Sequence, residues 1–263
     1  MLPFLKRIRE LGCRTLVECT AAYFGRAPAL LKRLSDASGL HILANTGYYG
    51  AANDRYVPDH AFKETADQLA QRWLKEWREG IDNTAIRPGF IKIGVDGGDL
   101  SDIDRKLVRA AARTHLSSGL TLAVHTGGSA EAAQGQLAVL REEGVDPTAW
   151  IWVHAQKVED TDPLIQAAES GAWISFDTIR PNSVQKHLER VRFMKQHGFL
   201  KQVLLSHDGN SFRFGGKPPR SHNTLFTTFI PALESAGFPP EEIDQLTVKN
   251  PREAFTVRVR QRS

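Results

Sequence analysis

Short apolar runs alternate along this chain with longer segments of helical pattern, and this alternation limits the folds open to it. Seven runs predict β-strands: 14–18, 41–46, 90–95, 120–125, 149–154, 173–177 and 202–206. Segments between them, such as 27–38, 60–80 and 102–119, have helical periodicity and stop at a glycine, a residue common at helix C-termini. Strands that are apolar along their whole length are typical of a parallel sheet covered by helices on both faces. The sequence therefore predicts an α/β protein of repeated βα units.

We expect these strands to close into a (β/α)8 barrel rather than to form an open, doubly wound sheet. Polar residues end several successive strands, and only closure brings those ends around one point. The 263 residues match the roughly 250 of one such domain. No linker, repeat or low-complexity segment divides the chain, so residues 1–263 are predicted to form a single barrel domain.

The strand count is seven, one short of a closed barrel. The first predicted element is a helix, Leu5–Leu11, which should follow a strand. We therefore expect an incomplete N-terminus, through a mis-assigned start or a truncated chain. A barrel open at this seam would expose two strand edges, which predicts poor solubility or association.

The composition argues against nucleic-acid and membrane partners. The net charge of +4 comes from scattered charges, without an arginine-rich arm or a basic stripe interleaved with aromatic residues. The sequence has no apolar run of roughly 18 residues and no signal peptide. Cys13 and Cys19 do not suggest a disulfide framework, and we interpret them as small core residues in a reducing compartment. A cytoplasmic protein is expected, although an absent N-terminal segment could have carried an export signal.

Four polar residues lie at or near the carboxyl ends of separate predicted strands: Lys92, His125, His154 and Asp208. The spacings between them are 33, 29 and 54 residues, which correspond to one, one and two βα units. In a closed barrel these strand ends converge at one mouth, where barrel enzymes hold their active sites. The sequence therefore predicts that the four side chains form one metal-binding site.

Lys92 is the member hardest to explain by packing, because burying an ammonium group is costly unless it is paired or neutral. Burial lowers the pKa of a lysine, and a neutral amine can react as a nucleophile. Such an amine can add CO₂ and become a carbamate, an anion whose two oxygens can bridge a pair of metal ions. A salt bridge from Lys92 to Asp208 or Asp177 is the alternative, and either histidine alone could be a packed or hydrogen-bonded residue.

The chain resembles the phosphotriesterase family of the amidohydrolase superfamily over essentially its whole length. The matching stretches are RTLVE (14–18), TGYY (46–49), GFIKI (89–93), VHT (124–126), VH (153–154), QVLLSHD (202–208) and TVKNP (247–251). The resemblance implies two divalent metal ions. Zinc is the metal expected, and iron, cobalt or manganese are the alternatives. It implies that Lys92 is a carboxylated bridging lysine and that His125 and His154 bind the more exposed metal. Asp208 would bind the buried metal and take a proton from the bridging hydroxide during direct hydrolysis.

Two departures from the family pattern bear on activity. The His-x-His pair with which the family's first strand binds the buried metal does not occur in this sequence. Lys157 and Thr178 stand where phosphotriesterases carry an acidic relay residue and a relay histidine. A barrel that binds one metal or a small ligand without turnover is therefore the alternative to a hydrolase.

Tyr49 and Arg180 are the predicted substrate-binding residues. Tyr49 matches the position where lactonases of the family place a tyrosine near the scissile carbonyl, and Arg180 lies on a loop that contacts substrate in the family. Tyr49 and the lost acidic relay favour a small-molecule lactone or carboxyl ester over a phosphotriester. The glycine-rich loop 209–220 is interpreted as a lid, and the family resemblance implies a homodimer.

Overall fold

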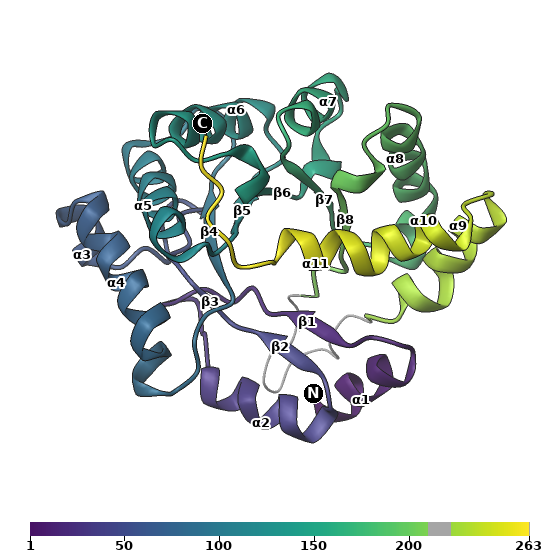
Figure 1. Cartoon of the computed structure of the whole chain (residues 1–263), viewed down its shortest axis with the longest axis horizontal. Coiled ribbons are helices and arrows are strands. Elements are labelled where there is room, and N and C mark those ends of the chain that lie inside the picture. The colour runs from purple at the N-terminus through teal and green to yellow at the C-terminus, as the bar shows by residue number, and fades with distance from the viewer. Residues whose placement is uncertain (210–221, 263) are drawn as a thin grey trace.

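The computed structural model describes residues 1–209 and 222–262 and places short strands around a common centre, with helices outside them (Figure 1). The strands are β1 (Thr15–Val17), β2 (His41–Leu43), β3 (Asn45–Thr46), β4 (Phe90–Val95), β5 (Leu122–Thr126), β6 (Trp150–Val153), β7 (Trp173–Phe176) and β8 (Val203–Leu205). Every pairing between them is parallel, in the orders β1-β2 and β3-β4-β5-β6-β7-β8. Only Ala44 separates β2 from β3, so the predicted strand 41–46 is present in two pieces. The predicted fold of parallel strands alternating with helices is confirmed.

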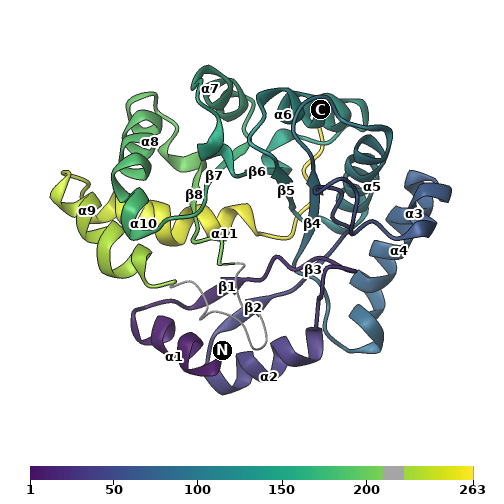
Figure 2. The ribbon, with the colours of Figure 1, turned by 180° about the vertical axis from the view of Figure 1, so that it is seen from behind.

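The helices surround the strands on the outside. They are α1 (Leu2–Glu10), α2 (Pro28–Ser38), α3 (Asp59–Lys63), α4 (Ala66–Glu79), α5 (Asp102–Ser118), α6 (Ala130–Glu142), α7 (Asp162–Glu169), α8 (Val184–Gln196), α9 (Ile230–Ser235), α10 (Pro240–Asp244) and α11 (Asn250–Ala254). Seen from behind, α1 and α2 lie beside β1 and β2, while α3 to α8 follow the arc of the remaining strands (Figure 2). None of the helices described is long and apolar enough to cross a membrane.

The predicted continuous helix 60–80 is wrong, because the chain breaks into α3 and α4 at Glu64 and Thr65. Thr65 is extended, and its hydroxyl accepts a hydrogen bond from the backbone of Gln68 at 3.2 Å. The backbone N–H of Thr65 in turn donates to Oε1 of Gln68 at 2.8 Å, which completes a capping box. Glu64 accepts two hydrogen bonds from Arg72, so its side chain also favours the start of α4.

The interior of the strand arc has an apolar layer at the end where the strands begin. Alternate residues of a strand point to the same face, so one residue from each neighbouring strand contributes to the layer. Its buried members are Phe90, Ala123, Ile151, Trp173, Leu204 and Ala254. Ala254 belongs to α11, which crosses this end of the molecule (Figure 1), and its carbonyl accepts a hydrogen bond from the hydroxyl of Thr121 at 2.5 Å. The apolar layer and α11 thus fill one end, and polar residues two positions further along β4, β5 and β7, namely Lys92, His125 and Ser175, face the other.

The strands at the ends of the two orders have fewer hydrogen-bonded neighbours than those between them. Within residues 1–209 and 222–262, β1, β2, β3 and β8 each pair with one of these strands only, whereas β4 to β7 are paired on both sides. The loop predicted as a lid, 209–220, lies outside the described residues except for Gly209.

Candidate active site at the carboxyl ends of the strands

Lys92 lies in the middle of β4 with 4% of its surface exposed. Its Nζ donates a hydrogen bond to the carbonyl oxygen of Ile93 at 2.8 Å, and among the described residues it forms no ion pair. Burial lowers the pKa of Lys92 to about 8, against the opposing influence of Cys19, Asp177 and Asp208. A substantial fraction of this amine is therefore neutral near pH 8, which is the form that reacts with CO₂.

His125 and His154 come together on the strands next to Lys92. His125 lies near the end of β5 and His154 directly follows β6, and their ring centroids are 4.5 Å apart with the planes nearly perpendicular. Burial, followed by the positive charge of Lys92, lowers the pKa of His125 to about 2. The ring of His125 is therefore neutral at pH 7, the state in which imidazole binds metal ions.

Asp177, directly after β7, holds His154 in place. Its Oδ2 accepts a hydrogen bond from the backbone N–H of His154 at 2.7 Å, and its Oδ1 accepts one from the hydroxyl of Ser175 at 2.9 Å. The Nδ1 of His154 lies 3.3 Å from the same Oδ2 but is not aligned for a hydrogen bond, so the backbone contact is the firmer one. Burial would raise the pKa of Asp177, but the contacts with His154 outweigh it and lower this pKa, so the carboxylate is ionised. The sequence suggested Asp177 only as a possible partner of Lys92.

Three residues just beyond β6, β7 and β8 adopt left-handed backbone conformations. They are His154 (φ 70°), Thr178 (φ 63°) and Asp208 (φ 48°). Such angles are uncommon for residues other than glycine, and strain of this kind is concentrated at functional sites. Asp208 is half-buried, its backbone N–H donates to the Ser206 hydroxyl at 3.2 Å, and its charge acts on both Lys92 and Tyr49. Lys92, His125 and His154 thus lie together, and Asp208 is linked to them through the action of its charge on Lys92.

Tyr49 forms an aromatic wall beside this cluster. Its ring centroid lies 5.2 Å from that of His125 and 5.3 Å from Nζ of Lys92. On its other side Phe24 stacks nearly parallel at 5.0 Å, and Tyr56 lies at 6.3 Å. A Cβ on Gly94 would come within 2.8 Å of the Tyr49 ring, so only glycine leaves room for the ring at that point of β4. Phe24 carries no signal in the sequence, because its role depends on its contact with Tyr49 across two loops.

Arg180 and Cys19 differ from their expected surroundings. Among the described contacts of Arg180, the backbone N–H donates to the Ser183 hydroxyl at 2.9 Å, while Nε is buried without an acceptor. No described contact joins Arg180 to the histidines. The interpretation of the cysteines as core residues is wrong for Cys19, which is exposed, whereas Cys13 is half-buried and packs against the buried cluster of Leu5, Ile8 and Leu40. Cys19 follows β1, where fewer neighbours cover the chain, and it is close enough to influence the pKa of Lys92.

The donor set suits a divalent cation in chemical type. Two adjacent imidazoles, one of them held neutral, are typical zinc ligands, and a carboxylate completes such sites. In the described part of the chain, however, no three His, Cys, Asp or Glu side chains gather closely enough to hold one metal ion. The two histidines therefore need a further anionic donor. Lys92 is the buried polar group beside His125, and it has no carboxylate partner of its own among the described residues. The residues fit a metal centre if this amine supplies that donor.

Comparison with known proteins points to one family. Residues 3–255 match the model of the phosphotriesterase family. The chain is 30% identical over 249 residues to the phosphotriesterase homology protein of Escherichia coli (strain K12), covering 93% of this chain and 84% of that protein. A crystal structure described as that protein, complexed with phosphate in the active site, matches with a TM-score of 0.88 and 29% identity, covering 97% of this chain and 88% of the other. The aryldialkylphosphatase of Saccharolobus solfataricus is 26% identical over 265 residues, covering 96% of this chain and 83% of that protein.

Proposed function

This chain belongs to the phosphotriesterase family, whose members are hydrolases, and we propose that it is a metal-dependent hydrolase of small-molecule esters. Its substrate would be a lactone or carboxyl ester in preference to a phosphotriester. The reaction would take place at the mouth lined by Lys92, His125, His154 and Asp208.

The observation that carries the proposal is the environment of Lys92. A lysine kept for stability at a site this buried would require a carboxylate within ion-pair distance, since an unpaired buried charge is strongly destabilising. Lys92 instead has a backbone carbonyl, an aromatic ring and two nearby carboxylates that act only at longer range. An amine in this position is suited to conversion into an anion.

In the proposed chemistry the neutral amine of Lys92 attacks the carbon of CO₂. A C–N bond forms, one N–H proton passes to solvent, and a carbamate anion remains. Two divalent ions, for which zinc is the metal expected, would be held by the carbamate oxygens, His125, His154 and Asp208. When bound, such ions acidify a water molecule and polarise a carbonyl or phosphoryl oxygen. Asp177 would keep His154 oriented, and Asp208 would accept the proton of the attacking water.

Tyr49 and Arg180 would contact the substrate. The Tyr49 ring already lies against His125, so a bound acyl group would meet an aromatic surface next to the metal ligands. Burial raises the pKa of Tyr49, so its hydroxyl stays protonated and can donate a hydrogen bond to a carbonyl oxygen. Arg180, on the loop after β7, has a buried Nε that lacks an acceptor. A donor of this kind would suit a carbonyl or carboxylate oxygen of the substrate.

The experiment measures metal content by mass spectrometry together with turnover of lactones, aryl esters and aryl phosphotriesters. We expect about two equivalents of metal and turnover in the unmodified protein. Lys92→Met, which keeps most of the length of the side chain but removes the amine, should lose both. Lys75→Met, at an exposed lysine of α4, is the control and should lose neither. Turnover that persists in Lys92→Met or after removal of metal by a chelator would refute the proposal. Metal binding without turnover of any of the three substrate classes would favour the non-catalytic barrel.

A further inference from the structure

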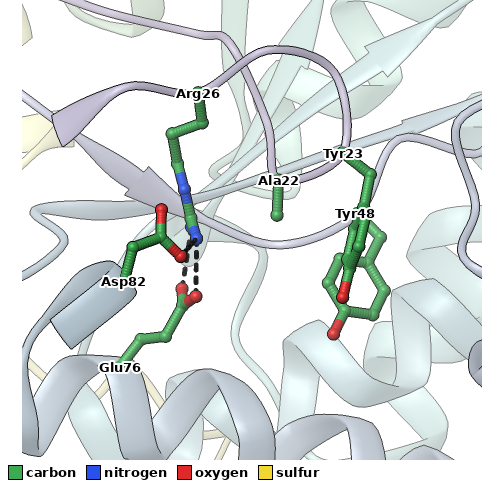
Figure 3. A pocket seen from close by; sticks show the side chains of 6 residues that line it. All are labelled: Ala22, Tyr23, Arg26, Tyr48, Glu76 and Asp82. Carbon is green, nitrogen blue, oxygen red and sulfur yellow. Dashed lines mark hydrogen bonds and ion pairs between the residues drawn. The ribbon is translucent and has the colours of Figure 1, made fainter.

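A second pocket lies outside the mouth, between the loop after β1, the end of β3 and helix α4 (Figure 3). We call it the outer pocket, and its volume is about 180 Å³. Its lining residues are Ala22, Tyr23, Arg26, Tyr48, Glu76 and Asp82. A cavity of this size holds a molecule of a few non-hydrogen atoms, since one water occupies about 30 Å³ of liquid.

The outer pocket is distinct from the mouth although the two are built on adjacent residues. Tyr49 turns toward His125 and Lys92, whereas Tyr48 packs edge-on against Trp73 of α4 at 5.3 Å. In the facing loop Phe24 stacks on Tyr49, and its neighbour Tyr23 packs edge-on against Tyr48 at 5.4 Å. Two consecutive aromatic pairs thus separate the outer pocket from the candidate active site.

One wall of the outer pocket carries an excess of negative charge. The side chain of Arg26 is 3% exposed, and its guanidinium is bound by Glu76 at 2.6 and 2.8 Å and by Asp82 at 3.2 Å. The same group also donates to the carbonyl of Asn45 at 3.0 Å, and its Nε is buried without an acceptor. Arg26 therefore has no accessible donor left for an anion. The carboxylates of Glu76 and Asp82 remain 23% and 55% exposed, so they can accept further hydrogen bonds.

The opposite wall is aromatic. Figure 3 shows the rings of Tyr23 and Tyr48 side by side, across the cavity from the carboxylates of Glu76 and Asp82. Tyr23 is 61% exposed and has a left-handed backbone (φ 62°), an unusual state for a bulky residue. The faces of tyrosine rings attract cations, and their carbon atoms accept alkyl groups.

We propose that the outer pocket binds a small primary alkylammonium ion. Its three N–H donors would reach the carboxylates of Glu76 and Asp82, and its alkyl chain would lie on the exposed ring of Tyr23, beside Tyr48. An anion is disfavoured because both Nη groups of Arg26 are engaged and its unpartnered Nε is buried, while a neutral alcohol would gain no attraction from the excess negative charge. The site is separate from the proposed hydrolytic centre and does not depend on it.

Isothermal titration calorimetry of the full chain at low ionic strength tests the proposal, with n-butylammonium, 1-butanol and butyrate as probes. We expect saturable binding of n-butylammonium, weaker or no binding of 1-butanol and none of butyrate. Tighter binding of butyrate than of n-butylammonium, or equal binding of n-butylammonium and 1-butanol, would overturn the proposal.

Two variants locate the binding. Asp82→Asn removes the charge at a residue with φ 50°, a conformation that asparagine tolerates, and Tyr23→Asn removes the ring at φ 62° for the same reason. Each should weaken n-butylammonium binding about two- to fivefold. The control is Asp36→Asn on α2, where an exposed carboxylate is likewise paired with a cation, and it should leave the affinity unchanged. Unchanged affinity in both pocket variants, or an equal loss in Asp36→Asn, would contradict the assignment.

Discussion

The strands β4 to β7 and the pair β1-β2 differ in how completely their neighbours cover them. All residues of β4 and β7 are buried, and β5 and β6 have one half-buried residue each. No residue of β1 or β2 is buried. Lys92, His125 and His154 all belong to the covered arc, whereas Cys19 follows the exposed pair. The candidate metal ligands with close contacts to one another therefore lie on or directly after strands that are paired on both sides.

The largest expected contrast is in turnover. His125→Ala or His154→Ala should reduce turnover about a thousandfold or more, because each removes a ligand from the proposed metal centre. Cys19→Ala, on the exposed side, should change turnover only a few-fold. Steady-state kinetics with an aryl ester measures the turnover of all three variants. A loss in Cys19→Ala as large as in the histidine variants would contradict the assignment of the metal centre to the covered strands.

Metal affinity should depend on Asp177, which anchors His154 from the next strand. Asp177→Asn keeps an oxygen but removes the charge, and we expect zinc affinity to fall about 10–100-fold. Asp96→Asn is the matched control, since Asp96 accepts hydrogen bonds from Ala52 and Asn53 and has no described contact with either histidine. Competition with a coloured chelator measures the affinity, and equal losses in the two variants would show that Asp177 has no special role.

The packing of Tyr49 against β4 can be tested at two glycines. Gly94→Ala places a methyl group 2.8 Å from the Tyr49 ring and should lower the free energy of unfolding by about 1–3 kcal/mol. Gly97→Ala, with its nearest neighbour at 3.6 Å from the new methyl group, should be tolerated. Urea denaturation compares them, and equal stability of the two variants would mean that the ring moves aside freely.

The chemistry of Lys92 should depend on pH in a defined direction. Burial places its pKa near 8, so the neutral, reactive fraction rises as the pH increases through that value. At constant dissolved CO₂, the rate of carbamate formation should increase about fivefold from pH 7 to pH 8 and level off above pH 9. Recovery of turnover in metal-free protein supplied with zinc and CO₂ reports this rate, and a rate independent of pH would contradict the assignment.

The smallest expected effect is the loss of stability when one methyl group is removed from β4 or from β2. Ile93→Val in β4, a fully buried residue, should cost about 0.5–1.5 kcal/mol of stability. Ile42→Val in β2 is half-buried and should cost less than about 0.5 kcal/mol. Equal costs in urea denaturation would mean that β2 is covered in solution as fully as β4.

The sequence predicted those parts of the molecule that depend on local pattern. The parallel strands follow from their apolar runs, and Lys92 stands out because a lysine inside such a run needs an explanation. Features that depend on contacts between distant segments could not be predicted from the sequence. Asp177 acts through the backbone of His154, and Phe24 acts through Tyr49, so neither carries a local signal.

Two predictions are wrong because a general pattern was followed where the local surroundings favour another structure. The helical periodicity of residues 60–80 predicts one helix. Thr65 followed three residues later by Gln68 is, however, a known helix start, and a new helix begins there. The average burial of cysteine predicts a core position for Cys19, but β1 lies at the less covered edge, where Cys19 is exposed.

The most direct test of the account is a crystal structure of the protein grown with zinc at pH 8, with anomalous data collected at the zinc edge. The account predicts density for a carboxylate beyond Nζ of Lys92 and zinc peaks between it and the rings of His125 and His154. A bare ammonium bonded to the carbonyl of Ile93 or to an acid, with no anomalous peak beside the two rings, would contradict it.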